Sequence, residues 1–251
     1  MNDSAKPNVL LCKGCWQHMK MPIPLRGPIS IPFRVFGIRP SQMNPNLCTI
    51  CETNFTRVKR RKQIVVPTTI LFADVRGYTG LSETLGAEKM ANMLHCFYDN
   101  CTKAVWEKDG IVNKFIGDAA LAIFNFPIMQ DDHVQQAVWA ALDLLKACDE
   151  QKEQVTAEID GENLSLGVGI GIHTGEASIG ELGSSYKEFT AIGPVVNLAS
   201  RIQGQAEPGE VLVTEDVYQV VADSFPHAEK RVCDLKGVDH PVTGYVLVRQ
   251  E

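Results

Sequence analysis

The chain lacks the features that would place it across a membrane. Its 251 residues contain no run of 18 or more apolar residues, and the amino terminus has no signal-peptide pattern. We therefore expect a soluble, cytoplasmic protein with no membrane span. This length suits one or two domains, whose cores can reach ordinary size without covalent staples.

Negative charge is scarce at the start of the chain. Residues 1–62 hold eleven Lys and Arg but only Asp3 and Glu52, a net charge of +9. The whole chain carries −6, so the remainder carries −15. This polarisation indicates a basic module beside an acidic domain that contacts it. The basic run at 58–62 has no aromatic residues and is typical of a linker, so we do not expect nucleic acid as a partner. A nucleic-acid-binding module is the alternative.

Four of the eight cysteines form two C-x-x-C pairs, Cys12 with Cys15 and Cys48 with Cys51. Thiolates at this spacing can share one tetrahedral Zn²⁺. The 32 residues between the pairs are proline-broken and too short for a core of their own, so a metal is the expected staple. An iron–sulfur cluster and free surface cysteines are the alternatives. The other four fall in apolar patterns and are expected to be buried thiols: Cys96, Cys101, Cys148 and Cys233.

Asp74 is the first candidate functional residue, because it ends an apolar, β-branched run at 66–73. Such a run predicts a buried strand, and open sheets place ligand sites at the carboxyl ends of their strands. A turn with free backbone N–H groups follows, which suits an anion such as a polyphosphate. Its residues are Val75, Arg76, Gly77, Tyr78 and Thr79.

Asp118 lies at the tip of a predicted hairpin, with Gly117 in the turn between two apolar segments. If this hairpin neighbours the first strand, Asp118 faces Asp74. Two carboxylates beside a phosphate-binding turn can hold Mg²⁺. Taken alone, Asp118 is explained as well by a turn residue that hydrogen-bonds its own backbone.

Periodicity predicts helices at 87–108 and from about 133 to 151, and a strand at 164–173. One face of that strand carries glycines, which permit close approach of another backbone or of a ligand. A turn is expected at Thr174-Gly175. A later strand at 187–192 leads into a helix on which Asn197 and Arg201 share a face and can bind ribose and phosphate oxygens. An exposed polar face also explains this pair.

Three motifs occur in the chain in this order: Phe72-x-Asp74-Val75-x-Gly77-Tyr78-Thr79, Lys114-x-x-Gly117-Asp118, and Ala191-Ile192-Gly193-x-x-Val196-Asn197-Leu198-Ala199-Ser200-Arg201. Together they resemble the catalytic domain of class III nucleotidyl cyclases. The resemblance covers about residues 64–249 and leaves 1–58 as the four-cysteine, zinc-binding-like module. It implies an α/β (α+β) ferredoxin-like sandwich with added elements, which agrees with the mixture of β and α segments.

The resemblance also implies a reaction, in which the 3′-hydroxyl of ATP attacks the α-phosphorus and expels pyrophosphate. Two Mg²⁺ or Mn²⁺ ions would be held by Asp74, Val75 and Asp118. Arg201 would stabilise charge at the α-phosphate, and Asn197 would orient the ribose. In this family the site forms between two subunits, which implies a homodimer. Asp74 and Asp118 would come from one subunit, and the other would supply Lys114, Thr190, Asn197 and Arg201.

The Lys114/Thr190 pair implies the base. A cationic donor and a hydroxyl suit N1 and the 6-amino group of adenine, which favours ATP, and the pair resembles a subgroup that includes bicarbonate-responsive cyclases. A pyrimidine cyclase of antiphage signalling and a catalytically silent nucleotide-sensing module are the alternatives. The family often places a second phosphate-binding Lys where this chain has Val238. Lys236 is the candidate replacement, and a triphosphate with fewer cationic contacts is the alternative.

Overall fold

A single eight-stranded sheet organises the part of the chain that the computed structural model describes, which is residues 9–57, 63–78, 86–158, 167–183, 185 and 188–248. Its strand order is β2-β3-β1-β4-β6-β8-β7, and β5 pairs with β4 off this path. The strands are β1 (Ile64–Arg76), β2 (Ile111–Ile116), β3 (Ala119–Phe124), β4 (Gly167–Leu182), β5 (Glu188–Ile192), β6 (Val211–Thr214), β7 (Glu229–Cys233) and β8 (Val242–Leu247).

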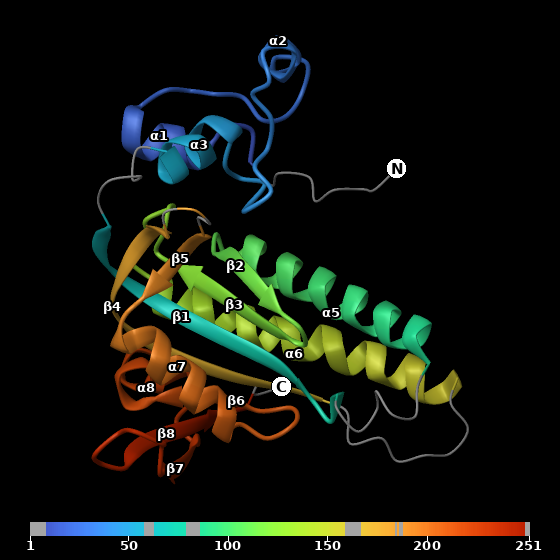
Figure 1. Cartoon of the computed structure of the whole chain (residues 1–251), viewed down its shortest axis with the longest axis vertical. Helices are drawn as coiled ribbons and strands as arrows, with labels where there is room; N and C mark the ends of the chain where they lie inside the picture. The colour runs from blue at the N-terminus through green and yellow to red at the C-terminus, as the bar shows by residue number, and fades with distance from the viewer. Residues whose placement is uncertain are drawn as a thin grey trace.

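Helices cover both faces of this sheet (Figure 1). Two long helices pack on one face and α7 packs on the other, so the predicted mixed α+β arrangement is confirmed. None of the helices within the described residues is both long and apolar enough to span a bilayer. The helices are α1 (Lys13–Met19), α2 (Ser30–Val35), α3 (Thr49–Arg57), α5 (Ala87–Glu107), α6 (His133–Glu158), α7 (Pro194–Gln205), α8 (Glu215–Val221) and the 3-10 helix η1 (Ala222–Ser224).

The central strand β1 has β3 paired with one edge and β4 with the other, and helices pack on both of its faces. Side chains alternate along a strand, so Leu71, Ala73 and Val75 enter the core under α5 and α6. The alternate side chains, those of Ile70, Phe72 and Asp74, point to the face that carries α7. The predicted apolar strand is confirmed, and Asp74 lies close to its carboxyl end.

The glycine face of β4 receives the backbone of α7. A Cβ atom added at Gly171 would lie 2.2 Å from the backbone nitrogen of Gln203. The prediction of a close backbone approach is therefore confirmed. The expected turn at Thr174-Gly175 is wrong, because β4 runs unbroken through it and pairs with Thr69 and Thr68 of β1. The long partner strand satisfies the backbone of this segment as a ladder.

The scattered cysteines are only partly buried. Cys101 and Cys233 are buried and Cys148 is half-buried, but Cys96 is exposed, so its predicted burial is wrong. Cys96 precedes the buried Phe97 on α5, and a step of one residue turns a helix by about 100°. The helix itself, predicted at 87–108, is confirmed, whereas α6 extends beyond its predicted end near residue 151.

The amino-terminal module, residues 9–57, packs against the end of the sheet where β2 begins (Figure 1). Asn46 Nδ2 donates to Asp109 Oδ1 at 2.9 Å, and Asn44 Nδ2 donates to the Gly110 carbonyl at 2.8 Å. Lys13 forms an ion pair with Asp109, which joins the basic module to the acidic domain. The division into residues 1–58 and 64–249 stays a prediction, since one apolar cluster contains side chains from both parts.

Replacing Gly171 by Ala should lower the free energy of unfolding by about 3 kcal/mol, because the added methyl group meets backbone that cannot move aside. Urea denaturation measures this. Gly204→Ala is the matched control, since nothing lies within 4 Å of its Cβ position. In the exposed last turn of α7 it should raise stability by up to about 1 kcal/mol. Equal stability of the two variants would contradict the close packing of α7 on β4.

Candidate active site

The structure brings Asp74 and Asp118 together at one end of the sheet. Asp74 is opposite Ala119 in the β1/β3 ladder, and the backbone N–H of Val75 donates to the Asp118 carbonyl at 3.1 Å. Both aspartates are half-buried. Burial raises the pKa of Asp74, and the nearby Asp118 charge raises it further. Two carboxylates in this position repel each other, so a divalent cation between them would be stabilising.

Two neighbours oppose that repulsion at Asp74. Coulombic attraction to Arg76 and a hydrogen bond from Gln203 both lower its pKa, although burial and Asp118 outweigh them. The Arg76 guanidinium donates to the Gln203 carbonyl, which holds it against the end of α7. Sequence reasoning missed Gln203, because it lies on the buried face of α7, away from Asn197 and Arg201.

The turn after β1 matches the expectation only in part. Gly77 has φ +81°, a left-handed conformation that suits glycine. The N–H of Val75 is already bonded to Asp118, so that donor is not available to an anion. The Val75 side chain is buried in the apolar core under α5 and α6, and the half-buried Tyr78 packs against this core. Thr79 lies outside the described residues.

A second polar group gathers where α7 meets the loop before β8. Arg201 Nη1 donates to the Gly237 carbonyl at 3.0 Å, and Gly237 adopts φ +71°. Lys236 beside it is exposed, as is Asn197 on α7. The predicted phosphate-binding Arg201 and Lys236 are thus brought to one region of the surface. A cation pair of this kind suits an anionic ligand.

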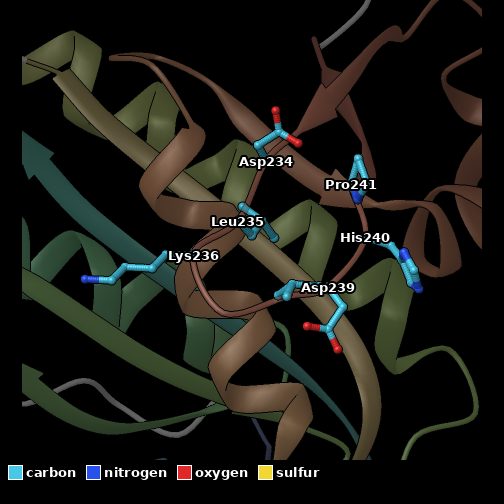
Figure 2. A pocket seen from close by; sticks show the side chains of 7 residues that line it. Asp234, Leu235, Lys236, Asp239, His240 and Pro241 are labelled. Atoms are coloured by element: carbon cyan, nitrogen blue, oxygen red, sulfur yellow. The ribbon is translucent and has the colours of Figure 1, made fainter.

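The same loop lines a hollow of about 330 Å³, and Figure 2 shows its lining side chains. Lys236 points away from Asp234, Asp239 and His240. Asp74 and Asp118 do not line this hollow, so it is not a cleft around the carboxylate pair.

A third group joins β2 to β5. Lys114 Nζ forms an ion pair with Glu188 Oε1 at 2.5 Å. Thr190 is 7% exposed, and its hydroxyl donates to Asn113 Oδ1 at 3.2 Å. The structure therefore places the predicted base-binding residues Lys114 and Thr190 on strands that touch. Sequence reasoning missed Asn113 and Glu188, whose only signal was that they stand next to or near the predicted pair.

The two C-x-x-C pairs converge as predicted. The four sulfur atoms lie within 4.8 Å of one another, and all four residues are buried. Cys15 Sγ lies 3.3 Å from both Cys48 Sγ and Cys51 Sγ. Four sulfurs around one Zn²⁺ are roughly 3.8 Å apart at the usual Zn–S distance. The donor set therefore fits a tetrahedral metal ion.

Backbone groups also support thiolates in this cluster. The N–H groups of Cys15 and Cys48 point to Cys12 Sγ at 3.4 and 3.2 Å. Such donors stabilise the deprotonated sulfur that binds a metal.

Comparison with known proteins decides the family. Residues 61–249 match the model of the adenylate and guanylate cyclase catalytic domain. The chain belongs to this family. Among solved structures, the adenylyl cyclase CyaB from P. aeruginosa aligns with a TM-score of 0.69 at 29% identity, over 76% of this chain and 97% of that one. The guanylyl cyclase Cya2 aligns with a TM-score of 0.67 at 30% identity, over 74% and 93%.

The curated relatives of this cyclase domain are longer proteins. The adenylate cyclase of Anabaena cylindrica is 35% identical over 187 residues, which is 70% of this chain and 36% of that protein. Guanylate cyclase 32E of Drosophila melanogaster is 27% identical over 186 residues, 73% of this chain and 16% of that protein. Adenylate and guanylate cyclases both occur among these relatives, so the relatives do not decide which nucleotide base this chain accepts.

Proposed function

We propose that the chain is an adenylate cyclase, which converts ATP to 3′,5′-cyclic AMP and pyrophosphate in intracellular signalling. The observation that carries this proposal is the pairing of Asp74 with Asp118 at the end of β1 in a chain of the cyclase family. The pair fits two Mg²⁺ or Mn²⁺ ions, which, when bound, neutralise the triphosphate and acidify the 3′-hydroxyl.

The other polar residues then have separate tasks. Arg201, fixed by Gly237, offers its remaining N–H groups to the phosphate that gains charge, and Lys236 adds a second cation. Asn197 on the exposed face of α7 binds the ribose and orients its 3′-hydroxyl. Lys114 donates to the ring nitrogen of adenine, while Thr190 meets its exocyclic 6-amino group.

A homodimer completes the site in this proposal. Among the described residues, neither Asp74 nor Asp118 forms an ion pair with Lys114 or Arg201, and the hollow at residues 234–241 does not reach the carboxylates. Each subunit therefore offers two incomplete halves. A two-fold axis pairs each carboxylate half with the partner's other half and generates two equivalent sites.

Asp118→Asn should lower cyclic AMP formation roughly 100-fold or more, because the lost carboxylate removes several kcal/mol of metal-dependent charge stabilisation. The measurement is product formation from ATP with Mg²⁺ or Mn²⁺. Asp99→Asn is the matched control, since Asp99 is exposed on α5. Full activity of the Asp118 variant would contradict the proposed metal site.

Mixing two inactive proteins, Asp74→Ala and Asn197→Ala, should restore activity to about a quarter of the wild-type value. Random exchange makes half of the dimers mixed, and each mixed dimer has one intact site of two. The pair Asp74→Ala with Asp118→Ala is the control and should give no rescue, because both changes damage the same half. Rescue in neither mixture, with subunit exchange shown by light scattering of tagged chains, would argue against shared sites.

We also propose that Cys12, Cys15, Cys48 and Cys51 hold a structural Zn²⁺. Metal analysis of the purified protein should give one zinc per chain, and Cys48→Ser should lower both zinc content and thermal stability. Cys96→Ser should change neither, since Cys96 is exposed and outside the cluster. Iron with acid-labile sulfide, or a folded protein without metal, would contradict the zinc assignment.

A further inference from the structure

Asn113 on β2 makes two hydrogen bonds to β5 that bear on base selection. Its Nδ2 donates to the Phe189 carbonyl at 2.9 Å, and its Oδ1 accepts from the Thr190 hydroxyl at 3.2 Å. We infer that Asn113 is a positioning residue that holds Thr190 as a hydrogen-bond acceptor toward the nucleotide base. The inferred result is selection of bases with an exocyclic amino group. This inference rests on the proposed cyclase function.

The orientation of the Asn113 amide is determined by its neighbours. The Phe189 carbonyl can only accept a hydrogen bond, so the amide nitrogen must face it. The amide oxygen is then directed to Thr190. A flipped amide would set two oxygens against each other at Phe189 and would lose that bond.

Thr190 has one hydroxyl proton to give, and its two close partners are both acceptors. Asn113 Oδ1 lies at 3.2 Å and the Ala191 carbonyl at 3.4 Å. The proton is therefore directed to the protein, and the remaining hydrogen-bonding capacity of the oxygen is acceptor only. Because only 7% of Thr190 is exposed, water does not readily replace these partners.

Lys114 next to Asn113 supplies the opposite polarity. Its ammonium has three donors, and Glu188 Oε1 at 2.5 Å takes one of them. In the proposed pairing, Lys114 meets the ring nitrogen and Thr190 meets the exocyclic group. An acceptor at that position is matched by the amino group of adenine or cytosine. It opposes the carbonyl oxygen of guanine or uracil.

The polarity of Thr190 therefore predicts an order of substrates. ATP and CTP should be used in preference to GTP and UTP, with ring size separating the first two. Without the Asn113 acceptor, the Thr190 hydroxyl can turn its proton to the ligand and donate to the carbonyl oxygen of guanine or uracil. A residue that only stabilised β2 against β5 would, when replaced, lower turnover of all four nucleotides in parallel.

The test is kcat/KM for ATP, CTP, GTP and UTP with wild-type protein, Asn113→Leu and Asn113→Ala. Both variants should lower the ATP-to-GTP ratio at least roughly tenfold, since a mismatched buried polar group is the main source of such discrimination. Asn113→Asp loses the bond to the Phe189 carbonyl but keeps an acceptor for Thr190, so it should retain the wild-type ratio. In a Thr190→Val background, Asn113→Leu should leave the ratio unchanged, because no hydroxyl remains to be oriented.

The outcomes separate this inference from the proposed function. A wild-type protein that cyclises none of the four nucleotides overturns the proposed function. A wild-type protein that cyclises ATP, with the same ATP-to-GTP ratio in Asn113→Leu and Asn113→Ala, overturns only the role of Asn113. A wild-type preference for GTP or UTP overturns the acceptor assignment of Thr190. Circular dichroism identifies a variant that fails to fold, and the other variant then decides.

Discussion

Two carboxylates held close together are the constraint on which the site depends. Strand pairing places them there, because β1 is fixed between β3 and β4 and cannot move Asp74 away from Asp118. Burial raises the pKa of Asp74, and the nearby Asp118 charge raises it further. In the proposed site, a divalent ion between the two side chains would offset this repulsion.

Close packing of α7 on β4 fixes the positions of Gln203 and Arg201 relative to the two aspartates. The missing side chain at Gly171 lets the helix backbone approach the sheet, and Gln203 then reaches both Gly169 and Asp74. The same helix presents Arg201 to the Gly237 loop on its other side. One rigid element therefore relates the carboxylate end of the sheet to the cationic loop.

Local patterns were enough to predict features whose signal is contiguous in sequence. The run before Asp74, the hairpin tip at Asp118 and the two C-x-x-C pairs each carry their own physical reason, and the structure brings the members of each group together. What was missed depends on contacts between distant segments. The unbroken course of β4 requires the whole length of β1, and the role of Asn113 requires β5 beside β2. No spacing rule within either segment encodes these contacts.

Contacts from the amino-terminal module, residues 9–57, hold the backbone bend that precedes β2. Asp109 adopts φ +58°, an uncommon backbone state for a residue other than glycine, and it is held by Lys13 and Asn46. This bend leads directly into β2, the strand that carries Lys114. Lys13 and Asn46 adjoin the two cysteine pairs, and a fragment that begins at Ile64 would lack both of these contacts to the bend before β2.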